Sequence, residues 1–206
     1  MFCLPFAAHT GRCCFAILVW CWLAGGVVEA QFGLVSREES LASVFPDATV
    51  ESERLFLTDA QAERIEELAR TDLDSKLYAR YIATRNGSVV GRAYVETHQV
   101  RTKKESLIVS LDPTGRVLRI DVTVFLEPPE YIAGPSWMAQ FYDKPLDNDL
   151  ALQRAIRPIA GATLTAQAVT AALRRVMAID QVLSLPEGLG QCLGGSGGGS
   201  TRFIPW

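Results

Sequence analysis

The segment from Ile159 to Asp180 combines a reactive hydroxyl with the signature of a helix start. Gly161 and Ala162 precede Thr163, and an apolar stripe at helical spacing follows, made of Val169, Ala172, Leu173, Val176 and Ile179. We therefore expect Thr163 at a helix N-terminus, where free backbone N–H groups and partial positive charge favour an anion. Phosphate is the anion that fits such a terminus best.

A structural interpretation of the same segment is also open. Thr163 or Thr165 is then an ordinary N-cap, and Gly161 relaxes the incoming turn. In either case Gln167 and two arginines, Arg174 and Arg175, are expected to lie off the apolar stripe. The arginines are predicted to occupy the last turns, where they complement the helix dipole.

The longer string from Ile159 to Thr170 resembles the flavinylation segment of the FMN-binding domain family. That family includes the FMN-carrying subunits of the sodium-pumping NADH:quinone reductase and of the Rnf complex, and small exported proteins that this chain resembles more. In the family, a dedicated FMN transferase esterifies the corresponding threonine to the FMN phosphate. The resemblance thus implies covalent FMN on Thr163, with the cofactor-binding segment Gly161, Ala162, Leu164 and Thr165 around it.

Two positions depart from the family pattern. The family usually has Asp six residues before the modified threonine, and Ser or Thr three residues before it. This chain has Arg157 and Ala160 there. Because the transferase reads that pattern, both positions bear on the efficiency of attachment, while the hydroxyl and the helix terminus remain.

A second candidate region lies between the predicted sheet and this helix. Glu127-Pro128-Pro129-Glu130-Tyr131 is expected to be rigid and extended, and a short helix carrying Trp137 and Phe141 follows Gly134. One interpretation makes the two aromatic residues core anchors. The other, supported by a similar string in exported family members, places Glu130, Tyr131 and Trp137 along the isoalloxazine ring, because aromatic faces stack on flavins.

His98 and Arg101 form a third candidate region, in a string that resembles the family's "H-x-V-R-T". The plain interpretation of His98 is a surface histidine at the end of a strand. In the functional interpretation both residues face the flavin, and Arg101 stabilises negative charge on the reduced ring or pairs with the phosphate. A lone histidine does not complete a zinc site, so no metal is expected.

Residues 1–30 have the pattern of a secretory signal peptide. Arg12 precedes an apolar run from Phe15 to Val28, and Val28-Glu29-Ala30 forms a cleavage site. The run is shorter than the roughly 20 residues of a spanning helix, which favours cleavage over a retained anchor. We expect an extracytoplasmic protein, either periplasmic in a bacterium or secreted. After cleavage only Cys192 remains among the five cysteines, which excludes an internal disulfide framework.

The mature chain is predicted to be one α+β domain, in which a twisted antiparallel meander packs against flanking helices. Capping signals predict helices after Ser36 and Thr58. Strands are expected over Leu77–Thr84, Val89–Val100, Leu107–Leu111 and Val117–Phe125, with turns at Asn86-Gly87 and at Asp112-Pro113-Thr114-Gly115. Residues 31–183 then form the FMN-binding domain, and residues 184–206 form a flexible Gly/Ser-rich tail.

These patterns favour an exported flavoprotein electron carrier with FMN on Thr163. Its expected partners are an FMN transferase for maturation and a redox partner, either a haem protein or a membrane reductase. Two alternatives are a flavin-free module that binds a ligand or protein, and a stand-alone FMN-dependent reductase. The net charge of −3 argues against nucleic acid as a partner, and no Rossmann glycine pattern suggests nicotinamide binding.

Overall fold

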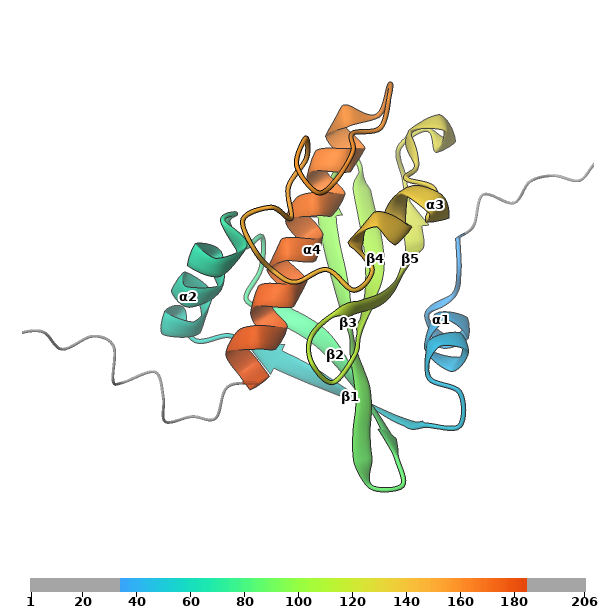
Figure 1. The fold of residues 1–206 in the computed structure, drawn as a ribbon, viewed down its shortest axis with the longest axis vertical. Helices are drawn as coiled ribbons and strands as arrows, with labels where there is room; N and C mark the ends of the chain where they lie inside the picture. Colours follow the sequence, from blue (N-terminus) through green and yellow to red (C-terminus); the bar gives the residue numbers. More distant parts are fainter. Residues whose placement is uncertain (1–33, 185–206) are drawn as a thin grey trace, which may run out of the picture. The chain divides into compact units, whose positions relative to one another are not determined.

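Five strands form a single antiparallel sheet in which each strand pairs with its neighbours along the chain (Figure 1). The computed structural model describes residues 34–184; the predicted signal peptide, most of the predicted tail and Cys192 lie outside these residues. The strands are β1 (Thr49–Phe56), β2 (Leu77–Arg85), β3 (Ser88–Gln99), β4 (Lys104–Leu111) and β5 (Val117–Phe125). This sheet and its flanking helices confirm the predicted α+β fold.

Local signals account for the turns and for the helix starts. Asn86 and Gly87 both have positive φ, at 51° and 77°, as a two-residue hairpin loop requires. The Ser36 hydroxyl accepts a hydrogen bond from the Glu39 backbone N–H and begins α1 (Arg37–Val44). Thr58 and Gln61 form a complete capping box at the start of α2 (Asp59–Ala69).

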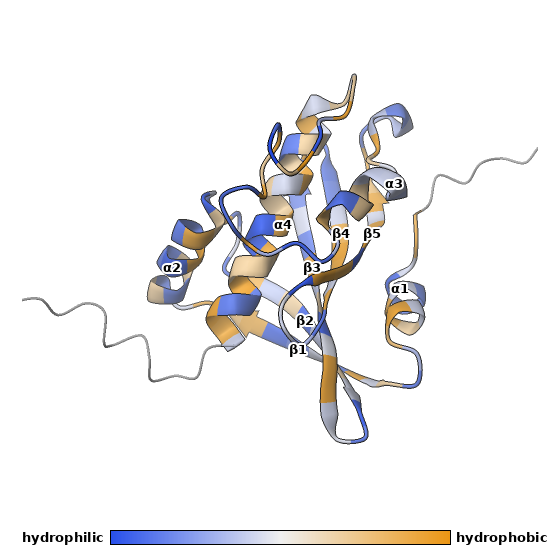
Figure 2. Ribbon diagram, in the orientation of Figure 1, coloured by the Kyte–Doolittle hydropathy of each residue, from blue (hydrophilic) through white to orange (hydrophobic). Residues whose placement is uncertain are grey.

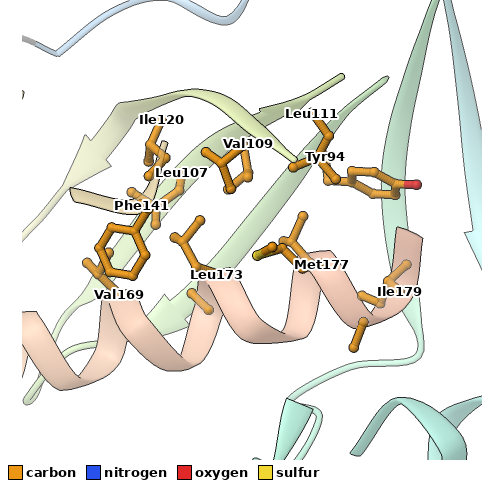
Figure 3. Packing of buried hydrophobic residues seen from close by; sticks show 14 of the residues in the cluster. Tyr94, Leu107, Val109, Leu111, Ile120, Phe141, Val169, Leu173, Met177 and Ile179 are labelled. Carbon is orange, nitrogen blue, oxygen red and sulfur yellow. The ribbon is translucent and has the colours of Figure 1, made fainter. Parts of the chain in front are cut away.

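One face of the sheet is covered by the long helix α4 (Thr163–Ser184), with α2 beside it (Figure 1). The predicted stripe of α4 is buried against alternate residues of the strands, and Figure 3 shows Leu173 and Met177 pointing toward Val109 and Leu111. Figure 2 shows hydrophobic and hydrophilic residues alternating around α2, as expected for a helix with one buried face.

The other face of the sheet holds a smaller cluster under α1, in which Leu41 and Phe45 pack on Ala83, Ala93 and Ile108. Ala93 and Ile108 are adjacent in sequence to Tyr94 and Val109, which belong to the main core, so the pleat separates the two clusters. A Cβ at Gly91 would clash with the Phe45 ring and lie 2.7 Å from the Leu111 carbonyl oxygen. Glycine at that position therefore permits α1 to dock.

The connection between β5 and α4 contains η1 (Pro129–Tyr131), α3 (Pro135–Met138) and η2 (Ala139–Phe141). The predicted short helix after Gly134 is thus present, and Phe141 is fully buried as a core anchor. Beyond it the chain crosses α4 before returning to the start of that helix (Figure 1). Within residues 34–184, no helix has both the length and the apolar character needed to span a membrane.

Two expectations about these elements are wrong. Four strands are predicted from the sequence, but the sheet has a fifth, β1, an edge strand that carries Glu51 and Glu53 and lacks an apolar alternation. Arg174 and Arg175 do not complement the end of the helix, since α4 continues to Ser184 and both side chains are buried. The Arg174 guanidinium donates to backbone carbonyls, and Arg175 pairs with Glu96.

Candidate functional site

A cavity of about 260 Å³ opens at the N-terminus of α4. It lies where α4 meets the turn between β3 and β4 and the segment after β5. Seven of the ten residues predicted for the site line it together: Arg101, Tyr131, Gly161, Ala162, Thr163, Leu164 and Thr165. The remaining lining residues are Val100 and Glu127, which the sequence reasoning did not include in the site.

The start of α4 is built by Gly161, which has a φ of +80°. That left-handed conformation suits glycine, because a side chain there would crowd the backbone. The Ala162 N–H donates to the Ile159 carbonyl oxygen. Within α4, the first N–H that donates to a preceding carbonyl oxygen is that of Ala166, which donates to Ala162 O at 3.1 Å. The N–H groups of Thr163, Leu164 and Thr165 therefore have no backbone carbonyl partner, as is usual in the first turn of a helix.

The two threonines of this turn differ in exposure. Thr163 is exposed at the cavity, whereas Thr165 is only 1% exposed. A reagent or a modifying enzyme can reach the Thr163 hydroxyl without unfolding the helix. Of the two, only Thr163 is therefore accessible from solvent.

Glu127 holds the turn that carries Arg101. Its Oε1 atom accepts hydrogen bonds from the backbone N–H groups of Thr102 and Lys103, both at 2.7 Å, and from the Thr102 hydroxyl at 3.3 Å. The Thr102 and Lys103 N–H groups lower the pKa of the Glu127 carboxyl, because they stabilise its charged form. This clamp fixes the β3–β4 turn beside α4, so that Arg101 lines the cavity.

Trp137 and Glu130 do not line this cavity. The Trp137 indole N–H donates to the Arg157 carbonyl oxygen at 2.7 Å, and its ring packs edge-to-face on Phe141, with centroids 5.3 Å apart. Trp137 lines a separate cavity of about 560 Å³ together with Lys144 and Arg157. Glu130 is exposed, which leaves Tyr131 as the aromatic residue that η1 presents to Thr163.

His98 is not the surface histidine of the plain interpretation, since it is only 3% exposed. Its Nδ1 atom lies 2.6 Å from Glu96 Oε2, and its Nε2 atom lies 3.1 Å from Glu105 Oε2. Burial alone lowers the pKa of His98, but the hydrogen bonds to the two carboxylates outweigh it and raise the pKa to about 9. Both ring nitrogens therefore carry protons at neutral pH.

Arg175 completes this buried network. Its Nε atom donates to Glu96 Oε1 at 2.9 Å, and its Nη2 atom lies 3.4 Å from the exposed Asp74. His98 and Arg175 together outweigh burial and lower the pKa of Glu96. Both cations line a second cavity, of about 310 Å³, which adjoins the first at Val100 and Leu164. His98 thus lies one cavity away from Thr163.

The donors around Thr163 suit a phosphate. The first turn of α4 supplies backbone N–H groups, Arg101 supplies a guanidinium, and Thr163 supplies a hydroxyl. The wall also contains one carboxylate, Glu127, whose Oε1 atom accepts hydrogen bonds from the β3–β4 turn. Among residues 34–184, no group of His, Cys, Asp and Glu side chains has the arrangement of a metal site.

The hydrogen bonds of Glu127 to the β3–β4 turn could not be predicted from the sequence, because Glu127 lies 24 residues from Lys103 and no local pattern links the two. The same holds for the pair between Glu96 on β3 and Arg175 on α4, which are 79 residues apart. Comparison with protein-family models found no match, and comparisons with curated proteins and with solved structures found none either.

Proposed function

We propose that this protein is an exported flavoprotein electron carrier whose FMN is joined to Thr163 through a phosphoester. One observation carries the proposal: the cavity at the start of α4 gathers the exposed Thr163 hydroxyl, the Arg101 guanidinium and the Tyr131 ring. A helix N-terminus and an arginine suit a phosphate, and an aromatic side chain suits the rest of a flavin nucleotide.

Thr163 supplies the oxygen that becomes the bridging atom. Its hydroxyl releases a proton to solvent, and its oxygen forms a bond to the flavin-side phosphorus of an activated flavin phosphate, such as the phosphoanhydride of a flavin dinucleotide. The anhydride bond breaks and the nucleoside monophosphate leaves, so no oxidant or reductant is needed. Arg101 and the N–H groups of the first turn of α4 stabilise the negative charge on the phosphate oxygens.

The bound FMN supplies the electron transfer, as cofactors generally supply the chemistry that side chains lack. The protein contributes the tether, which suits an exported chain. Outside the cytoplasm free FMN is scarce, so a reversibly bound cofactor is lost by mass action. We further propose that a membrane donor reduces the protein and that a haem protein or a terminal reductase oxidises it.

The test is expression of the full chain with an FMN transferase, followed by acid denaturation and intact-mass measurement. We expect yellow colour that stays with the polypeptide and one FMN mass increment on the peptide that contains Thr163. Thr163→Val should abolish the increment and Thr163→Ser should keep it, because serine retains the hydroxyl. Thr165→Val is the matched control and should still be modified.

An increment that persists in Thr163→Val and disappears in Thr165→Val would move the attachment to the buried threonine and refute the assignment. Colourless wild-type protein that carries no increment would refute the electron-carrier proposal and favour a flavin-free binding module. Cell fractionation and N-terminal sequencing of the same preparation test export, for which we expect a mature chain that begins at Gln31 outside the cytoplasm.

A further inference from the structure

We propose that the second cavity, between α4 and the end of β3, receives the isoalloxazine ring of the FMN tethered at Thr163. Its lining residues are Asp74, His98, Gln99, Val100, Leu164, Gln167, Ala168, Ala171 and Arg175. This inference rests on the proposed function and adds to it the residues that hold the redox-active end of the cofactor.

The first cavity is small for a whole flavin nucleotide. At about 260 Å³ it lies below the roughly 300–1,000 Å³ that small-molecule sites usually occupy. The second cavity offers about 310 Å³, and the two share Val100 and Leu164 as lining residues. If the phosphate of the nucleotide is attached at Thr163, the rest of the nucleotide can extend along α4 into the second cavity, toward His98.

Two small side chains, Ala168 and Ala171, line the α4 side of the second cavity. Leu164, Ala168, Ala171 and Arg175 follow one another at spacings of four, three and four residues, so they form one stripe along α4. The two alanines are half-buried and leave the space above the helix open. The two alanines leave room for a planar ring between α4 and β3, whereas larger side chains at these two positions would fill the cavity.

The rim and the inner wall of the cavity are polar. Gln167 on α4 and Gln99 on β3 bring side-chain amides, and Gln99 also donates to the Arg101 carbonyl at 3.0 Å. The pyrimidine end of isoalloxazine alternates hydrogen-bond acceptors with an N–H donor, and a glutamine amide both donates and accepts. Gln167 can therefore pair with that end of the ring.

His98 and Arg175 make the inner wall, and Asp74 lies at the rim. The two cations already pair with Glu96 and Glu105, which neutralise them from within the sheet. The wall is thus held rigid by ion pairs and adds little net charge. We assign His98 and Arg175 a positioning role, because they keep the cavity open in one shape.

The experiment compares variants of the full chain, each loaded with FMN by the transferase. Ala171→Leu fills the second cavity from the α4 side. Gln167→Leu removes the side-chain amide at an exposed position, where the substitution should not disturb folding. Tyr131→Ala removes the aromatic side chain of the first cavity. Ala60→Leu, at an exposed position of α2 outside both cavities, is the matched control. The readouts are intact mass, visible circular dichroism, iodide quenching of flavin fluorescence and midpoint potential.

We expect every variant to keep the FMN increment on Thr163. Ala171→Leu should shift the flavin circular dichroism and iodide quenching to the values of free FMN, because the displaced ring enters solvent. Gln167→Leu should shift the midpoint potential, while Ala60→Leu should leave all four readouts at their wild-type values.

A contrary result is that both α4 variants keep the wild-type spectra and potential while Tyr131→Ala exposes the ring to iodide. The ring then lies in the first cavity, which overturns this inference but leaves the proposed function standing. If wild-type protein carries no increment at all, the proposed function and this inference are overturned together. The two failures are therefore separated by the mass of the wild-type chain.

Discussion

At the scale of single residues, Gly161 decides how the chain enters α4. It has a φ of +80° and open space where a Cβ would lie, so Gly161→Ala changes the backbone energy alone. We expect a loss of about 1–2 kcal/mol in unfolding free energy, together with reduced FMN occupancy of Thr163. Chemical denaturation and intact mass measure the two effects.

Gly134 provides the matched control, since a Cβ there would also meet open space, but the residue has a φ of −72°. Gly134→Ala should change the unfolding free energy by no more than roughly 0.5 kcal/mol. Equal losses in the two variants would show that the left-handed turn at Gly161 has no special role.

His98 gives the folded protein a pH dependence at the same scale. Its pKa is raised from 6.5 to about 9, so its contribution to stability is complete below pH 6.5 and is lost as the pH rises toward 9. For this buried side chain the loss is on the order of 3 kcal/mol. Denaturant titrations at pH 6, 7.5 and 9 should show a falling midpoint.

His98→Gln is the comparison for that series. It should be less stable than wild type at pH 6, because Glu96 and Glu105 lose a cation between them, and it should lack the decline between pH 6.5 and 9. Parallel pH profiles for the two proteins would exclude His98 as the titrating group.

At the scale of elements, Arg174 joins α4 to two other parts of the chain. Its guanidinium donates to Ala69 O at 2.6 Å and Leu68 O at 3.3 Å, at the end of α2, and to Asp147 O at 2.7 Å and Leu150 O at 3.0 Å, in the crossing connection. Arg174→Met should cost about 2–4 kcal/mol, because these acceptors lose their donor.

The control for Arg174 is Arg64, whose ion pair with Glu67 on α2 is exposed. Arg64→Met should change the unfolding free energy by no more than about 0.5 kcal/mol, since exposed pairs contribute little. Thermal or denaturant unfolding measures both variants. A cost for Arg174→Met as small as that for Arg64→Met would mean that water replaces the lost hydrogen bonds.

At the scale of the whole molecule, the core found among the described residues lies entirely between Leu41 and Ile179. A shortened chain of residues 34–184 retains both hydrophobic clusters and the bridge between Leu34 and Val122. We expect circular dichroism to show one cooperative unfolding transition, with the same midpoint as that of the chain of residues 31–206. A broad or displaced transition would show that residues outside this range contribute to the fold.

Much of this fold could be predicted because its signals are local. Thr58 with Gln61, Asn86 with Gly87, and the stripe on α4 each act within a few residues, and all three are present in the structure. β1 was missed because its pairing with β2 defines it, while its own side chains resemble those of a polar loop.

The candidate site divides in the same way. The sequence alone indicated Gly161 and Thr163 as a helix start, since a turn and the helix after it are encoded in adjacent residues. Tertiary structure decided which other side chains lie beside them. Glu127 holds the β3–β4 turn that carries Arg101, whereas the Trp137 indole N–H donates to the Arg157 carbonyl oxygen away from the cavity. It also brought Arg175 of α4 to Glu96 beside His98, because an ion becomes stable inside a protein through partners that folding supplies, and these two residues are 79 apart in the sequence.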